Sequence, residues 1–294
     1  KIYITGKGRC NVTNDVSPEE FFESVVHNAK FLKSSIYTFP PERLMRLLEE
    51  GGLPLKTERG NRVFPVSDHA SDVTKCLVQH CTKTGVRFLY NERVESVVKV
   101  SETVFCVRTD SGEFYADAVI VCTGGLSYPG TGSSGDGYRI AEDFGLNVVP
   151  CRASLCGIEC DMQGLASLQG LSLRNVRLSA FAQSKLLASH FGEMLFTHYG
   201  ISGPIVLTLS AEINELSVSG LELRLDLKPA LDEETLDKRI LRDFERYKNK
   251  LTVNALVDLL PKSIIEPVLN RSDISLNLPV NSLKREQRKR LCSS

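Results

Sequence analysis

The sequence predicts an α/β fold, α+β in its overall make-up, because strand and helix patterns alternate in the first half of the chain and separate in the second. Residues 119–122 form a β-branched run without a polar break, which is typical of a strand buried on both faces. A glycine-rich stretch follows, and residues 138–144 then carry apolar side chains at helical spacing, with Asp136 placed to cap that helix and Gly145 to end it. Strand, glycine loop and helix in this order indicate a turn where backbone N–H groups and a helix N-terminus face an anion.

Composition narrows the class of protein. The chain has 294 residues, of which 42% are hydrophobic and 24% charged, as in a soluble globular protein with room for two domains. Its 36 basic residues balance 36 acidic ones, so no global field favours nucleic acid or an anionic membrane as a partner. The sequence shows no apolar run of about 18 residues, no signal-peptide pattern and no lipidation motif. We therefore expect a cytoplasmic protein without a membrane partner.

The cysteines give little support for a metal site. There are nine of them, scattered along a chain too large to need disulfides, so reduced thiols are the expected state. Cys151, Cys156 and Cys160 form the only cluster in the sequence, and their spacing matches none of the usual zinc patterns. We predict small buried hydrophobic residues at these positions and no metal.

The first candidate binding segment lies near the start of the chain. Residues 1–5 alternate as a short strand and run into a Gly-x-Gly turn at 6–8, which permits positive φ and close approach of the backbone to a ligand. Arg9, Asn11 and Asn14 add donors that could hold a phosphate, a ribityl hydroxyl group or the polar edge of a ring. From spacing alone, an ordinary tight loop is an equally good interpretation.

Packing elements are expected next. Ser17 and Pro18 mark the start of a helix, and residues 41–50 predict another. Residues 57–65 have the pattern of a hairpin, and Ser67-Asp68 should cap a further helix. Strands are then predicted at 86–90, 94–100, 104–107 and 113–115, and they lead into the strand at 119–122. The glycine loop would thus lie at the carboxyl edge of a sheet, where open α/β sheets bind ligands.

After residue 150 the pattern changes. Alternating strands between 155 and 227 predict a separate β-rich domain, and helical patterns from 232 onward predict a small helical subdomain. His198, in a loop of the β-rich part, could be an acid, a base or a substrate ligand, although a lone loop histidine is more often structural. The basic run at 284–290 could imitate a nucleic-acid patch, but its flanking leucines favour a solvated helix face, and we expect no nucleic-acid partner.

Three motifs together resemble those of a known family. They are the segments 6–14, 122–138 and 192–204, with 62–68 fitting as well. In this order and spacing they resemble the bacterial FAD-binding flavoproteins of the aminoacetone-oxidase family. That group also looks related to a flavoprotein of bile-acid dehydroxylation, within the broad class of two-dinucleotide-binding-domain flavoproteins. The resemblance covers essentially all 294 residues.

The resemblance implies both domains and site residues. It implies a Rossmann-like FAD-binding domain at 1–152, an inserted β-rich domain at 153–229 and a helical subdomain at 230–294. Val94 would present its backbone to the adenine, and His198 would overhang the isoalloxazine, where it could orient or protonate a substrate. The remaining residues implied to bind the cofactor are Gly6, Gly8, Arg9, Cys10, Asn11, Asn14, Thr123, Gly124 and Gly125.

The sequence also departs from the family pattern. The family begins with a strand, a Gly-x-Gly-x-x-Gly turn and a helix, and it ends with a segment that returns under the flavin; residues 1–294 contain neither. If the chain is a truncated form, we expect severely reduced FAD affinity, because the pyrophosphate loses a helix N-terminus.

The resemblance predicts a function in outline. We predict an FAD-dependent oxidoreductase acting on an unidentified small molecule, with NAD(P)H as a candidate electron donor. The alternative is a flavin- or nucleotide-binding module with a macromolecular partner and no turnover of its own. The sequence leaves the substrate and the oligomeric state open.

Overall fold

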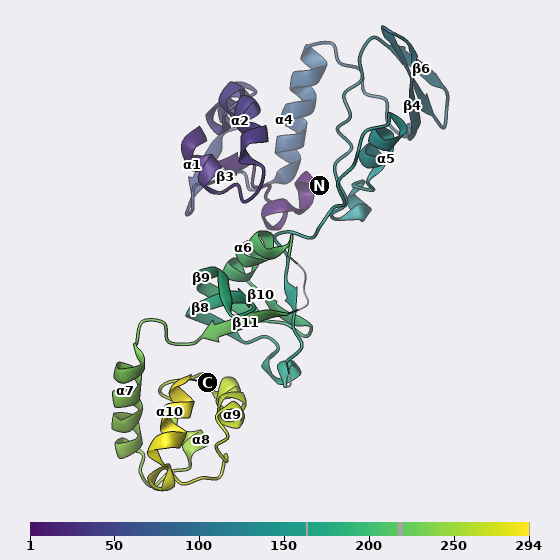
Figure 1. Ribbon diagram of the computed structural model, residues 1–294. Coiled ribbons are helices and arrows are strands. Elements are labelled where there is room, and N and C mark those ends of the chain that lie inside the picture. Colours follow the sequence, from purple (N-terminus) through teal and green to yellow (C-terminus); the bar gives the residue numbers. More distant parts are fainter. Residues whose placement is uncertain (163, 217–219, 294) are drawn as a thin grey trace. The chain divides into compact units, whose positions relative to one another are not determined.

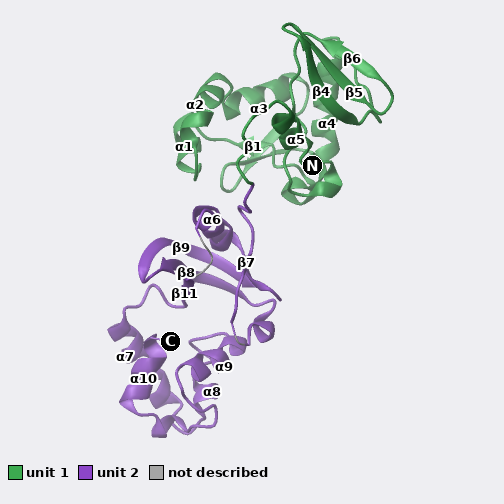
Figure 2. Ribbon diagram, turned by 45° about the vertical axis from the view of Figure 1, so that its right-hand side comes forward, with its two compact units in different colours: residues 1–150 green, residues 151–294 purple. Residues whose placement is uncertain are grey.

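The computed structural model describes residues 1–162, 164–216 and 220–293. It divides the chain into two compact units, Lys1–Pro150 and Cys151–Ser294 (Figure 2). The three-domain division implied by the family resemblance stays a prediction.

The first part of unit 1 packs short helices around a small sheet (Figure 1). Strand β1 pairs with β3, and β3 pairs with β2, in both cases antiparallel. Helices α3 and α4 supply most of the buried residues that form a core with Cys10. The elements are η1 (Ile2–Gly8), β1 (Thr13–Asn14), α1 (Pro18–Glu23), α2 (Ala29–Thr38), α3 (Pro41–Glu50), β2 (Leu55–Glu58), β3 (Arg62–Pro65) and α4 (Ala70–Lys83).

The second part of unit 1 is an antiparallel ribbon followed by a loop and a helix. The ribbon has the strand order β4-β5-β6, as the sequence predicts for three of its four expected strands. The elements are β4 (Val94–Ser101), β5 (Val104–Thr109), β6 (Glu113–Ala116), η2 (Pro129–Thr131) and α5 (Asp136–Asp143).

Local capping and turn signals are confirmed. Ser17 and Glu20 form the two hydrogen bonds of a capping box at the start of α1, where they satisfy N–H groups that the helix itself leaves free. Helix α3 begins at Pro41 and ends at Gly51, and the β2–β3 hairpin turns at Gly60-Asn61. The caps of two helices are wrong in detail: α4 begins only after His69, and Gly135 rather than Asp136 precedes α5.

Three predicted strands are wrong. Residues 1–5 form a local turn, in which the Ile4 N–H donates to the Lys1 carbonyl oxygen over 3.0 Å. Residues 86–90 and 119–122 belong to no helix or strand, no strand of the described residues pairs with either, and Ile120 is 87% exposed. A β-branched run becomes a strand only where a neighbouring backbone accepts and donates its hydrogen bonds. The sheets of the described residues are consequently antiparallel throughout.

Unit 2 combines a five-stranded antiparallel sheet with helices (Figure 1). The strand order is β11-β8-β9-β10-β7, and α6 packs its buried residues Ile205, Val206 and Leu209 into the same hydrophobic cluster as the sheet and the C-terminal helices. The elements are β7 (Ile158–Glu159), η3 (Leu165–Leu168), β8 (Ser172–Ala182), β9 (Lys185–Phe196), β10 (Gly200–Ser202), α6 (Pro204–Ile213), β11 (Leu221–Asp226), α7 (Glu233–Arg246), α8 (Thr252–Ala255), α9 (Lys262–Arg271), η4 (Val280–Ser282) and α10 (Arg285–Ser293).

Helix starts in unit 2 follow the predicted signals. Pro204 opens α6, and the Asp232 carboxylate accepts a hydrogen bond from the Thr235 N–H at the start of α7. No helix in the described part of the chain combines the length and the apolar character needed to cross a membrane.

Candidate cofactor-binding site

The backbone of residues 6–10 is held in an unusual conformation. Gly6, Lys7, Gly8 and Cys10 have φ values of 57°, 59°, 87° and 65°. Glycine adopts this left-handed region freely, but for Lys7 and Cys10 it costs about 1 kcal/mol or more each. A loop with this backbone needs contacts elsewhere that hold it in place.

Gly6 is required by its surroundings as well as by its φ. A Cβ at this position would lie 2.8 Å from Phe64 Cε1 and 2.9 Å from the Asn11 nitrogen. In the described residues the Asn11 N–H has no hydrogen-bond acceptor. The absence of a side chain at Gly6 therefore leaves an unpaired backbone donor uncovered, which suits a ligand oxygen or ring nitrogen.

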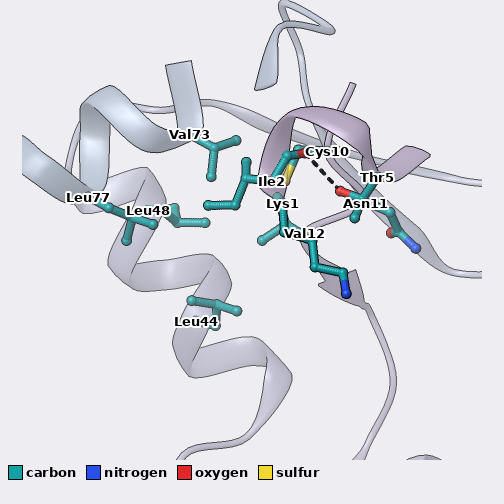
Figure 3. A pocket seen from close by; sticks show the side chains of 10 residues that line it. All are labelled: Lys1, Ile2, Thr5, Cys10, Asn11, Val12, Leu44, Leu48, Val73 and Leu77. Carbon is teal, nitrogen blue, oxygen red and sulfur yellow. Dashed lines mark hydrogen bonds between the residues drawn. The ribbon is translucent and has the colours of Figure 1, made fainter. Parts of the chain in front are cut away.

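A pocket of about 280 Å³ adjoins this loop (Figure 3). Figure 3 shows Leu44, Leu48, Val73 and Leu77 on helices at one side and the chain around Cys10 at the other. Burial raises the pKa of the Cys10 thiol, so this group is neutral near pH 7 and behaves as a small apolar side chain with a weak donor. The remaining lining residues are Lys1, Ile2, Thr5, Asn11 and Val12.

Arg9 is engaged with carboxylates of the same unit. Its Nη1 and Nη2 donate to the two oxygens of Glu58 over 2.9 and 3.3 Å, and Nη1 also donates to Asp68 Oδ1 over 3.3 Å. Its guanidinium carbon lies 4.0 Å from the centroid of the Phe64 ring. The hydrogen bond from Arg9 is the main cause that lowers the pKa of the Glu58 carboxyl. The sequence predicts that the Arg9 N–H groups are free to bind a ligand, whereas in the structure they donate to Glu58 and Asp68. A direct contact between Arg9 and a cofactor stays a prediction.

Asn14 and Val94 lie in regular pairing. The Asn14 Nδ2 donates to the Gly60 carbonyl oxygen at the tip of the hairpin over 3.4 Å. Val94 begins β4 and pairs with Thr109. Neither residue lines the pocket beside Cys10, so the structure gives Asn14 a role in holding the hairpin.

The second glycine loop packs against the start of α5. A Cβ at Gly124 would lie 3.0 Å from Ser133 Oγ, and one at Gly137 would lie 2.9 Å from Thr123 Oγ1. A Cβ at Gly125 would lie 3.2 Å from the Tyr138 hydroxyl oxygen. These glycines therefore allow a close fold of the loop on itself, although the predicted strand before it is unpaired.

Lys1, five residues before the first glycine segment, contacts the second one. The Lys1 Nζ donates to the Ser127 carbonyl oxygen over 2.9 Å and to Ser127 Oγ over 2.6 Å, although the two residues are 126 positions apart. It also lies 5.5 Å from the centroid of the Tyr128 ring. Lys1 lines the pocket with Asn11, whereas Thr123, Gly124 and Gly125 do not line it. Lys1 thus links the pocket to the second glycine segment, and of the two segments only the first lines the pocket.

His198 lies in unit 2, in the turn between β9 and β10. The turn is closed by the Thr197 N–H, which donates to the Gly200 carbonyl oxygen over 2.8 Å, and the exposed His198 ring packs edge-on against Tyr199 with centroids 5.0 Å apart. Its role over a flavin stays a prediction. His190, which no local sequence pattern links to α6, has its Nε2 2.9 Å from Glu212 Oε2.

Two further candidates are the cysteine cluster and the basic run, and the predicted burial of the cluster is wrong for Cys151. Cys151 is exposed and Cys156 and Cys160 are half-buried, and among the described residues no group of three or more His, Cys, Asp or Glu side chains could hold a metal ion. In the basic run, Arg288 makes two hydrogen bonds to Asp237, and Arg290 lies 3.6 Å from Asp273. These cations hold α10 in place.

Comparison with known proteins decides the family. Residues 1–223 match the model described as the HI0933-like protein Rossmann domain. The chain belongs to the HI0933-like family of flavoproteins. This confirms the resemblance inferred from the motifs and the α/β class with a Rossmann-like domain.

Individual relatives in the family differ in name. The chain is 29% identical over 289 residues to a 3-dehydro-bile acid delta(4,6)-reductase of Clostridium scindens, which covers 98% of this chain and 69% of the relative. It is 31% identical over 273 residues to a ribosomal RNA dihydrouridine synthase of Haemophilus influenzae, covering 90% and 64%. A ribosomal RNA dihydrouridine synthase of Escherichia coli is 33% identical over 269 residues, covering 90% and 63%. The chain therefore spans about two thirds of the length of these relatives.

Proposed function

We propose that this chain forms the substrate- and flavin-contacting part of an FAD-dependent oxidoreductase. Membership of the HI0933-like family and a relative named as a reductase support the general class. The observation that carries the proposal is the loop at 6–10, left-handed at Gly6, Lys7, Gly8 and Cys10, which leaves the Asn11 N–H uncovered beside a pocket. Lys1, which lines the same pocket, contacts Ser127 of the second glycine loop.

The loop and the pocket beside it offer the polar donors and the apolar surface that a flavin needs. The Asn11 N–H and side-chain amide would hold polar atoms of the cofactor, and the apolar wall of α3 and α4 would exclude water from it. FAD, when bound, supplies hydride transfer. The neutral Cys10 thiol adds no charge to the site, so the backbone and amide donors would set its polarity.

The substrate and the electron donor can also be proposed. One relative is named for reducing a bile acid, and by analogy we propose an unsaturated small molecule as substrate and NAD(P)H as donor. His198 would orient the substrate or transfer a proton to it, since an imidazole ring can both donate and accept a proton.

RNA is the second candidate, as substrate or as macromolecular partner. Two relatives are named ribosomal RNA dihydrouridine synthases, which favours it. The basic run at 284–290 gives it little support, because two of its cations already pair with Asp237 and Asp273.

Two measurements test the proposal. FAD is titrated by calorimetry into the purified protein at its full natural length, with the visible spectrum recorded alongside, and the loaded protein is then mixed anaerobically with NADH or NADPH. We expect saturable binding and bleaching of the flavin absorbance. A protein without FAD binding and without flavin absorbance would refute the oxidoreductase, and RNA binding that weakens steeply with salt and leaves the flavin unreduced by NAD(P)H would favour the binding module.

A further inference from the structure

Arg9 belongs to a closed ring of four alternating charges. Arg9 Nη1 lies 2.9 Å from Glu58 Oε1, which lies 3.6 Å from Lys56 Nζ. Lys56 Nζ lies 2.7 Å from Asp68 Oδ2, and Asp68 Oδ1 closes the ring 3.3 Å from Arg9 Nη1. The ring joins Arg9 of the first loop to Glu58 at the end of β2, 49 positions further along the chain, and to Asp68 after β3, 59 positions further along.

The ring has no net charge to offer a ligand. Two cations face two carboxylates, so an incoming phosphate group would have to compete with Glu58 and Asp68 for the same guanidinium. The Phe64 ring, which is 1% exposed, covers one face of that guanidinium at 4.0 Å. The same ring touches the position where Gly6 has no Cβ. Arg9 and Gly6 are thus packed on one aromatic side chain.

We propose that Arg9 is a positioning residue, whose pairing with Glu58 and stacking on Phe64 hold the left-handed backbone of residues 6–8 and of Cys10, on either side of it, in the conformation that presents the Asn11 N–H to the cofactor. The guanidinium itself does not contact the cofactor. This inference rests on the proposed FAD binding for its functional part. Its structural part rests on the strained φ values of Lys7 and Cys10, which lie two positions before and one position after Arg9.

Arginine is needed at this position because of its shape. Its planar fork donates to both Glu58 oxygens from two nitrogens while its flat face stacks on an aromatic ring, whereas a lysine ammonium has one nitrogen and no flat face. Arg9→Lys keeps the charge and removes the fork, so it should behave like the loss of Glu58.

Unit 2 contains a matched control. Arg224 donates to both oxygens of Glu222 over 2.8 and 3.0 Å and lies 4.4 Å from the Phe181 ring centroid. This pair has the same chemistry on the surface of β11, and no predicted cofactor residue belongs to it. Substitutions there report the general effect of losing a stacked arginine–carboxylate pair.

The test is a double-mutant cycle read by FAD titration. Arg9→Lys, Glu58→Gln and the double variant are compared with Arg224→Lys and Glu222→Gln. We expect FAD affinity to fall about fivefold in each single variant at the first pair, and no further in the double variant, while the control pair changes it little. A loss in Arg9→Lys with full affinity in Glu58→Gln would overturn the proposal, because Arg9 would then act on the cofactor directly.

A second readout needs no cofactor. Hydrogen exchange of the amides of residues 5–12 is measured in the chain without FAD. Faster exchange in Glu58→Gln, with no change in Glu222→Gln, is the expected result, and unchanged exchange at 5–12 would overturn the proposal even where FAD binding is lost. Absence of FAD binding in the unsubstituted protein at its full natural length would instead refute the proposed function and leave this readout to decide the role of Arg9.

Discussion

Gly6→Ala should destabilise the chain more than the same substitution at a glycine that also has a positive φ but has open space around it. An alanine at position 6 must keep φ near 57°, which costs about 1 kcal/mol. Its Cβ would also lie 2.8 Å from Phe64 Cε1 and 2.9 Å from the Asn11 nitrogen. Phe64 is 1% exposed, so its ring has little room to move. Overpacking of this kind costs about 1–3 kcal/mol, which gives a total of about 2–4 kcal/mol.

The matched control is Gly85→Ala. Gly85 has φ 85° and nothing within 4 Å of the position of a Cβ, so its substitution carries the backbone term alone, about 1 kcal/mol. The assay is urea unfolding of the two variants and the unsubstituted chain, followed by FAD titration of each. We expect Gly6→Ala to lose both stability and FAD affinity, and Gly85→Ala to lose only the smaller amount of stability. Equal destabilisation of the two variants would refute the reasoning, since it would show that Phe64 and Asn11 yield without cost.

Three further predictions follow from particular contacts. Arg9 lowers the pKa of Glu58 and Lys56 lowers that of Asp68, so the stability from these carboxylates is present above their ordinary pKa values and is lost as the pH falls through the lowered ones. Thermal unfolding from pH 7 down to about pH 3 should show this loss of stability. The loss should be smaller in Glu58→Gln, and an unchanged profile in that variant contradicts the prediction. His198→Ala should reduce turnover by about 100-fold at unchanged FAD affinity if the histidine transfers a proton, with His80→Ala on the exposed face of α4 as the control, and unchanged turnover removes that role. Ser17→Ala breaks the capping box of α1 and should lower stability by about 1 kcal/mol in chemical unfolding without affecting FAD affinity; a loss of affinity would mean that α1 supports the site.

The run at 119–122 shows that a side-chain pattern alone does not predict whether a segment pairs as a strand. Its composition suits a strand buried on both faces, yet Ile120 is 87% exposed and no described strand pairs with it. The segment at 86–90 has the same outcome, with Tyr90 70% exposed. Side-chain pattern sets which segments can be strands, but the ladder depends on backbone groups of another segment.

Arg9 shows the same limit for a site residue. Its place between two glycines and an asparagine suggested donors for a ligand, whereas the folded chain gives those donors to Glu58 and Asp68. One local signal could have pointed to this arrangement. Lys56 and Glu58 are two residues apart on β2 and therefore lie on one face of the strand. A pair of opposite charges on one face can bind a further charged side chain, as Glu58 binds Arg9.

By itself the sequence determined what depends on neighbours within a few positions: the capping box at Ser17, the start of α3 at Pro41, the β2–β3 hairpin, and the glycine motifs that place the chain in its family. Only the tertiary structure decided which extended runs are paired, which residues line the pocket, and which partners Arg9 takes. The physical reason is range. Caps and turns are closed by hydrogen bonds over three or four residues, whereas a strand ladder or a ring of charges needs groups that folding brings together from distant parts of the chain.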